Sequence, residues 1–314
     1  MRRSSALFAV ALVFSLPFGV AEAAGHVHGS LDSSFNGTGK VTTLIGSGDD
    51  AGYALAIQKN GKLVAAGTSY NGSGNDFALV RYNTNGSLDT SFNGTGKVTT
   101  SIGSGYDVAH ALAIQKDGKL VAAGYSWNGT DLDFALVRYN TNGSLDTSFN
   151  GTGKVTTLIG PGNDVAHALA IQKDGKLVAA GTAWSGTDND FALVRYNTNG
   201  SLDSSFGFNG AGEVTTPIGS DDDEAAALAI QKDGKLVAAG DSWNGTDFDF
   251  ALVRYNTNGS LDSSFNGFGK LTTSIGLSTD AADALMIQKD GKLVAAGGSI
   301  IGSDGEFALV RYWP

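Results

Sequence analysis

The tetrapeptide Gly-Ser-Leu-Asp occurs five times in this chain, and the repetition that it marks constrains the fold more than any other feature. Its copies begin at Gly29, Gly86, Gly143, Gly200 and Gly259, so successive starts are separated by 57, 57, 57 and 59 residues. A period of this length is typical of β-propellers and of linear repeat arrays. We therefore expect a single domain at 29–314, built from five units at 29–85, 86–142, 143–199, 200–258 and 259–314.

Each unit contains four segments that have the composition of β-strands. In the second unit these segments are residues 97–100, 109–115, 119–124 and 134–139. A Lys-Asp-Gly turn separates the middle two, and an Asp-Gly turn between apolar runs is a strong hairpin signal. No segment has a helical period with capping residues. The pattern predicts an all-β chain with four strands in each unit.

Five four-stranded units predict a five-bladed β-propeller. Residues 40–43 look like a strand that lacks a preceding partner, and residues 307–312 look like a strand that lacks a following one. Pairing these N- and C-terminal strands would close the ring and remove two exposed sheet edges. A linear solenoid is the structural alternative, but its two ends would lack capping repeats.

The N-terminus has the features of a secretory signal peptide at residues 1–23. Arg2 and Arg3 precede an apolar stretch at residues 6–20, and Ala21-Glu22-Ala23 provides a cleavage signal. Residues 24–28 would remain as a short tail. The apolar stretch is short for a membrane span, and no second one follows. We expect a secreted chain, extracellular or periplasmic, with no membrane span after cleavage.

The repeats also resemble a known family. The segments GSLDTSFNGTGKVTT, DVAHALAIQKDGKLVAAG and DFALVRYNTNG are similar to the delta-60 repeats of bacterial exported proteins, and the resemblance covers residues 29–312. It implies a secreted or surface location and a propeller-like array. It implies no particular biochemical activity, because the family is not defined by one.

Charge and recurrence separate scaffold positions from candidate functional ones. The formal net charge of −10 argues against nucleic-acid binding, which requires a basic surface. One Asp and one Arg recur in all five units, where an Asx-turn and an Arg–Asp pair would serve the scaffold. These positions are Asp32, Asp89, Asp146, Asp203 and Asp262, and Arg81, Arg138, Arg195, Arg254 and Arg311.

Acidic residues gather in two classes of loop that a propeller would place on one face. These loops hold 19 of the 31 Asp and Glu residues and none of the 21 Lys and Arg residues. Three of them contain Asp-x-Asp-Phe, and paired carboxylates near Asn and Thr oxygens suit calcium. The predicted calcium ligands are Asp131, Asp133, Asp188, Asp190, Asp247 and Asp249. Alternatively, these carboxylates cap turns and keep the face soluble.

The same loops carry an aromatic residue at one position of four units: Tyr70, Trp127, Trp184 and Trp243. Exposed aromatic rings beside carboxylates and amides are typical of surfaces that bind sugars. The alternative is that each ring packs between blades. We predict a ligand-binding role for these four residues, with a glycan or a protein as the partner.

One position near the start of the innermost strand varies sharply between the units. It is Tyr53, His110, His167, Ala226 and Asp283 in chain order. Symmetry would place all five around the mouth of the central channel, where the two imidazoles, the carboxylate and the phenol could bind a transition metal. Alternatively, the histidines only form hydrogen bonds with the acidic loops. We predict Tyr53, His110, His167 and Asp283 as ligand-binding residues.

The sequence favours a monomeric binding or structural module over an enzyme. It contains none of the common motifs for a nucleophilic serine, a phosphate-binding loop or a zinc protease, and it has no cysteine. We assign no catalytic residue. The alternative is a carbohydrate-active enzyme that uses channel carboxylates, with Asp283 as the first candidate.

Overall fold

The computed structural model describes residues 28–314, so the predicted signal peptide lies outside the described part of the chain. The first sheet contains β1 (Asp50–Ile57), β2 (Leu63–Tyr70), β3 (Asn75–Tyr82) and β4 (Lys97–Thr100). The second contains β5 (Asp107–Ile114), β6 (Leu120–Trp127), β7 (Leu132–Tyr139) and β8 (Lys154–Thr157). The third contains β9 (Asp164–Ile171), β10 (Leu177–Trp184), β11 (Asn189–Tyr196) and β12 (Glu213–Thr216), after the short 3-10 helix η1 (Phe208–Gly210).

The last two sheets continue the same antiparallel order. The fourth contains β13 (Asp223–Ile230), β14 (Leu236–Trp243), β15 (Phe248–Tyr255) and β16 (Lys270–Thr273). The fifth has only three strands, β17 (Asp280–Ile287), β18 (Leu293–Ile301) and β19 (Asp304–Tyr312). The prediction of an all-β chain of five propeller blades is confirmed. Among residues 28–314, no helix is long and apolar enough to cross a membrane.

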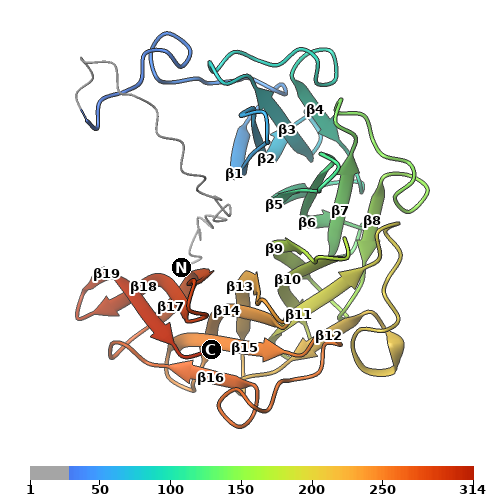
Figure 1. Cartoon of the computed structure of the whole chain (residues 1–314). Helices are drawn as coiled ribbons and strands as arrows, with labels where there is room; N and C mark the ends of the chain where they lie inside the picture. Colours follow the sequence, from blue (N-terminus) through green and yellow to red (C-terminus); the bar gives the residue numbers. More distant parts are fainter. Residues whose placement is uncertain (1–27) are drawn as a thin grey trace.

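Neighbouring blades pack through large side chains on the outer strands and small ones near the axis. Figure 1 shows β1, β5, β9, β13 and β17 lining the inside of the arc, with β4, β8, β12 and β16 outside. Between the first two blades, Phe77 and Leu79 of β3 share one buried cluster with Ala66 of β2 and Ala122 of β6. The alanines let the inner strands approach closely, while the phenylalanine and leucine fill the wider outer gap. The blades are therefore wedge-shaped, as their composition predicts.

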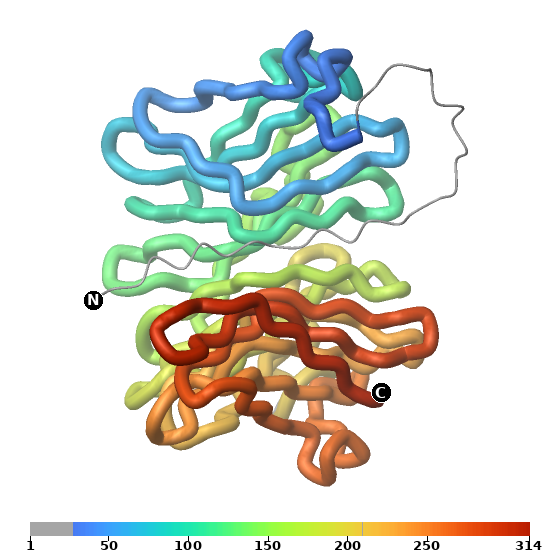
Figure 2. The backbone as a smooth tube through the Cα atoms, turned by 90° about the vertical axis from the view of Figure 1, so that its left-hand side faces the viewer, coloured from blue at the N-terminus to red at the C-terminus, as the bar shows by residue number. Residues whose placement is uncertain are grey.

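The predicted closure of the ring is not formed. Residues 40–43 are not a strand, and β19 pairs only with β18. Figures 1 and 2 show an open arc with the first blade at one end and the fifth at the other. Phe307 and Leu309 of β19 are 100% and 70% exposed as a result. The four packed blade interfaces set this arc and leave the two strand-like segments at opposite ends of it.

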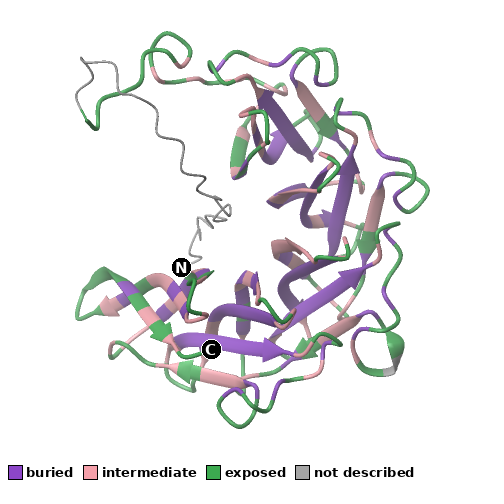
Figure 3. Cartoon of the chain, in the orientation of Figure 1, coloured by how far each residue is buried: buried purple, intermediate pink, exposed green. Residues whose placement is uncertain are grey.

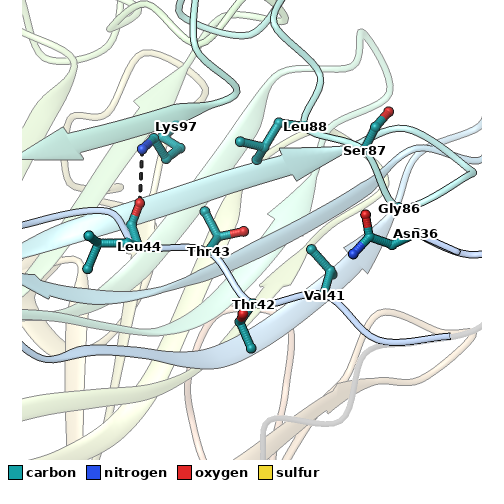
Figure 4. A pocket seen from close by; sticks show the side chains of 9 residues that line it. All are labelled: Asn36, Val41, Thr42, Thr43, Leu44, Gly86, Ser87, Leu88 and Lys97. Carbon is teal, nitrogen blue, oxygen red and sulfur yellow. Dashed lines mark hydrogen bonds between the residues drawn. The ribbon is translucent and has the colours of Figure 1, made fainter. Parts of the chain in front are cut away.

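The segment before the first blade is nevertheless held in place. Thr43 Oγ1 lies 2.7 Å from Tyr82 Oη, and Lys97 Nζ donates a hydrogen bond of 2.9 Å to the carbonyl oxygen of Leu44 (Figure 4). Thr100 and Tyr139 make the equivalent contact between the first two blades, at 2.8 Å. The segment thus lies against the first blade as the fourth strand of a preceding blade would, but it pairs with no strand. A surface pocket of about 330 Å³ adjoins it.

The predicted pairing of recurrent Arg and Asp residues is confirmed in the first four blades. Arg81 Nε lies 2.6 Å from Asp89 Oδ2, and Lys62 Nζ donates to the same oxygen at 2.7 Å. The Arg81 guanidinium also lies 4.6 Å from the centre of the Phe92 ring. No counterpart of this pair is found at Arg311 among the described residues of the fifth blade. Figure 3 shows that this blade is also less buried than the middle ones.

Candidate functional site

The innermost strand of every blade contains a β-bulge, and the extra residue is the one that varies between the units. In the second blade, Ala109 pairs with Gly124 and Ala111 pairs with Ala123, which leaves His110 without a partner. Tyr53, His167, Ala226 and Asp283 occupy the same place in the other blades. A bulge bends the strand and redirects the extra side chain, and bulges are frequent beside active sites.

The bulge also explains a recurrent glycine. A Cβ atom on Gly124 would lie 1.9 Å from the carbonyl oxygen of Val108, which no side chain tolerates. The bulge residue is free of such a constraint, because it opposes no residue of the neighbouring strand. The scaffold therefore fixes the backbone at this position and leaves the side chain open to specialisation.

Three of the four predicted ring residues lie together. The ring centres of Tyr53 and His110 are 5.4 Å apart, and those of His110 and His167 are 5.3 Å apart. Tyr125 of β6 flanks His110 at 5.5 Å. Burial lowers the pKa of His110 to about 4 and that of His167 to about 3, the latter with a smaller contribution from His110. Both imidazoles are therefore neutral at pH 7.

Asp283 does not join this group. It lies on the fifth blade, where desolvation raises the pKa of its carboxyl group. Its charge contributes to a raised pKa at Asp241 of β14, which faces Glu224 of β13 directly across the ladder. Burial is the main cause of that shift, followed by Glu224 and Asp283, and it takes the pKa of Asp241 to about 8. The predicted ring thus divides into an imidazole side and a carboxylate side.

The sequence interpretation did not identify Asp241 and Glu224 as a pair. It assigned both to loops, whereas the structure places both in strands. The position of Asp241 holds Thr68, Tyr125, Thr182 and Gly298 in the other blades, so variation at this position was the available signal. Cross-strand proximity was not visible without the exact register of β13 and β14.

Many of the acidic loop residues are structural and not exposed to solvent, which corrects the simple expectation of a negative face. Asp107 is fully buried, and its carboxylate accepts hydrogen bonds from the backbone N–H groups of Ile102 and Gly103. Burial raises the pKa of Asp107 despite these bonds. The equivalent residues accept bonds from the same loop in every blade: Asp50, Asp164, Asp223 and Asp280.

The predicted calcium ligands are tied to neighbouring side chains. Asn128 donates hydrogen bonds to both Asp131 and Asp133, and Asn244 does so to Asp247 and Asp249. In the third blade Ser185 donates to Asp188, and burial followed by the charge of Asp188 raises the pKa of Asp190 to about 6. Within residues 28–314, no three acidic or histidine side chains are grouped closely enough to hold a metal ion. Calcium binding stays a prediction, and these bonds provide the turn-capping alternative.

The four loop aromatics occupy the ends of β2, β6, β10 and β14 and pack partly against the chain. A Cβ atom on Gly105 would lie 2.8 Å from the Trp127 ring, and one on Gly162 would lie 2.7 Å from the Trp184 ring. Trp243 stacks edge-on against Phe248, with ring centres 5.1 Å apart. Each tryptophan is thus covered on one side and retains some exposed surface.

Trp184 differs because it also lines an open pocket of about 540 Å³ between the second and third blades. The lining combines one indole, one carboxylate and two amides with small residues: Thr130, Asp131, Pro161, Gly162, Asn163, Trp184 and Asn189. Hydrogen bonds hold its walls. Leu132 N–H donates to Asn163 Oδ1 at 3.0 Å, and Asn189 donates to Asp222 Oδ1 through both its backbone and its side-chain nitrogen.

Comparison with curated proteins found no sequence match. Among solved structures, Sqt1 from Chaetomium thermophilum is similar with 12% identity and a TM-score of 0.43, over 83% of this chain and 69% of that one. An arabinanase from Bacillus subtilis aligns with 12% identity and a TM-score of 0.41, over 82% and 92%. The β-propeller domain of the trilobed protease from Pyrococcus furiosus, described as having an open velcro topology, aligns with 11% identity and a TM-score of 0.41, over 83% and 68%.

A family model gives a clearer result. It matches the chain five times, with one match beginning in each unit, at residues 58–92, 115–149, 172–206, 231–265 and 288–314. Each complete match runs from the hairpin turn through the second and third strands of a blade to the Ser-Phe that follows Gly-Ser-Leu-Asp. The chain therefore belongs to the β-propeller family described as domain of unknown function DUF5122.

Proposed function

We propose that this protein is an exported, non-catalytic binding module that recognises a glycan at the pocket beside Trp184. The observation that carries the proposal is the convergence of one indole, one carboxylate and two amides in a single pocket between two blades. An indole face provides apolar area for the C–H face of a sugar ring at low entropic cost. The carboxylate and the amides are suited to accept and donate hydrogen bonds to its hydroxyl groups.

The surroundings narrow the class of glycan. The chain has a formal net charge of −10, and Asp131 lines the pocket directly. Acidic sugars would be repelled by this field, so a neutral or amino-substituted glycan is favoured. The bond from Leu132 to Asn163 and the bonds from Asn189 to Asp222 fix the pocket before any ligand arrives. Such preorganisation reduces the entropic cost of binding.

A glycan array probed with the whole exported chain tests this proposal. We expect binding to neutral or amino sugars and a loss of at least tenfold in affinity for Trp184→Ala. Trp127→Ala is the matched control, because it removes the same residue type from the same strand end in the neighbouring blade, and it should retain binding. No glycan bound, or equal losses in the two variants, would refute a site at Trp184.

Export rests on the predicted signal peptide and on the resemblance to delta-60 repeats. Cleavage after Ala23 would release a chain that begins at Ala24. Mass spectrometry of the protein recovered from outside the cytoplasm checks this directly. A recovered chain that still begins at Met1 would contradict export by this route.

A carbohydrate-active enzyme is a second candidate, and one observation favours it. Asp241, with its pKa of about 8, would be protonated at neutral pH beside Glu224. A glycosidase needs one protonated and one ionised carboxyl group near the scissile bond. Hydrolysis of a panel of chromogenic glycosides, abolished by Asp241→Asn, would support this function. The absence of hydrolysis across the panel would leave the binding module as the function.

A further inference from the structure

His110 and His167 form a pair of imidazoles that the packing of the blades does not require. Both are the extra residue of a β-bulge, on the neighbouring innermost strands β5 and β9. In the fourth blade the equivalent residue is Ala226, so the fold does not require an imidazole at this position. The Nδ1 atom of each ring is buried and has no hydrogen-bond partner among the described residues.

An unpartnered buried nitrogen is unfavourable, because the atom has lost its hydrogen bonds to water without replacement. Two such atoms on adjacent rings indicate a bound ligand more strongly than one would. Both are imidazole nitrogens, and a β-bulge places each of the two rings. No carboxylate of the described chain donates or accepts a bond with either ring, which excludes the alternative that the histidines serve the acidic loops.

The spacing of the two rings matches coordination of one ion. A metal bound by an imidazole nitrogen at about 2.0–2.1 Å lies about 3.2 Å from the ring centre. Two rings arranged about a tetrahedral ion would therefore have centres about 5.2 Å apart. The observed separation of the His110 and His167 ring centres is 5.3 Å, with the ring planes inclined at 46°.

An imidazole ring binds a metal through the lone pair of one ring nitrogen. Both residues are partly exposed. Tyr53 and Tyr125 form the walls beside His110.

We propose that His110 and His167 bind one divalent transition-metal ion at the inner edge of the second and third blades. Imidazole nitrogens suit zinc, copper and nickel, whereas calcium and magnesium prefer oxygen ligands. No third histidine or carboxylate of residues 28–314 joins the pair. Water molecules would complete the coordination of the ion.

Isothermal titration of the whole chain with Zn²⁺ tests the proposal. We expect one ion per chain at this site and at least a tenfold loss of affinity for His110→Ala and for His167→Ala. Ca²⁺ should not displace Zn²⁺ from this site. His28→Ala is the control for the N-terminal segment, and it should leave this binding event unchanged. Unchanged affinity in either ring variant would overturn the proposal.

A second measurement separates loss of a ligand from loss of fold. The imidazole resonances of His110 and His167 in the unaltered protein should shift together on addition of Zn²⁺, with a midpoint equal to the calorimetric one. Titration that leaves both imidazole signals unmoved would show that the two rings are packed only against each other.

Discussion

The Arg138 guanidinium and the Asp146 carboxylate form a buried ion pair, with Nε and Oδ2 2.7 Å apart. Lys119 Nζ donates to the same carboxylate oxygen at 2.8 Å, and Ser148 donates to the other oxygen. This carboxylate joins a hairpin turn, an outer strand and the connection to the next blade. One side chain therefore links three segments in each of the first four blades.

Removal of the Asp146 carboxylate should lower the free energy of unfolding strongly. Asp146→Ala leaves the Arg138 charge buried without its partner, and breaking a buried pair in this way typically lowers the free energy of unfolding by about 3–5 kcal/mol. Asp290→Ala removes an exposed carboxylate that pairs with Lys292, and it should change the free energy of unfolding far less, because solvent screens an exposed pair. Urea denaturation measures both, and equal costs would contradict the role of the buried pair.

Acid should weaken the same four contacts. Burial alone would raise the pKa of Asp146, but hydrogen bonds from Lys119 and Ser148 and the charge of Arg138 outweigh it and hold the pKa well below its usual range. A lowered folded-state pKa stabilises the protein above the unfolded value of about 4, and the contribution is lost as the pH falls below it. Urea midpoints between pH 5 and pH 2 should fall, and the fall should be shallower in Asp146→Asn.

The open end of the arc predicts unequal costs for the same substitution. Phe77 of β3 is fully buried, whereas its counterpart Phe307 of β19 is fully exposed. Phe77→Ala should lower the free energy of unfolding by about 3–5 kcal/mol, as expected for a buried phenylalanine. Phe307→Ala should cost less than about 0.5 kcal/mol. A large cost at Phe307 would show that β19 is covered in solution.

Two adjacent glycines of β18 test the bulge. A Cβ atom on Gly297 would lie 1.9 Å from the carbonyl oxygen of Ala281, whereas one on Gly298 would have no neighbour closer than 4.0 Å. Gly297→Ala should therefore lower the melting temperature by many degrees, because backbone must move to admit the methyl group. Gly298→Ala should be neutral or slightly stabilising. Thermal unfolding monitored by circular dichroism compares the two, and equal tolerance would mean that the bulge is absent.

The raised pKa of Asp241 predicts a loss of stability as the pH rises. Its folded-state pKa of about 8 exceeds the value near 4 of an unfolded chain, so the folded state holds more protons between these limits. Stability from this group is full below about pH 4 and declines up to about pH 8. Asp241→Thr introduces the residue of the first and third blades, and it should raise the melting temperature by several degrees at pH 8 but much less at pH 4. An identical gain at both pH values would contradict a raised pKa.

The strands were predictable because the same pattern of apolar segments and turns recurs in each unit. The second-unit segments at 97–100 and 134–139 lie within or match β4 and β7, and the Asp-Gly hairpin connects β5 and β6 as expected. The Arg–Asp pair was also predictable, since both residues recur at fixed spacing. Several strand ends were placed short by two or three residues, because cross-strand pairing extends the ladder beyond the apolar runs, as at Trp127 and Leu132.

The candidate sites were predictable only in part. Variation between the units identified the position of His110 and His167, because a repeated scaffold leaves little other reason for a residue to differ. Burial of Asp107 and the pairing of Glu224 with Asp241 were not predictable, because polarity alone does not show which carboxylates the backbone surrounds. Trp184 was predicted with three other aromatics, and only the packing of two loops shows that it alone lines the pocket beside Asn163.

The sequence by itself therefore determined the five repeats, their strands and the scaffold contacts, since local pattern and recurrence encode all three. The tertiary structure decided whether the ring closes, because closure depends on the angle that each packed blade interface adds and no single unit contains that angle. It also divided the variable ring into an imidazole pair and a carboxylate group. The distance between His110 and His167 arises from two bulges on separate strands, and only the packing of β5 against β9 sets it.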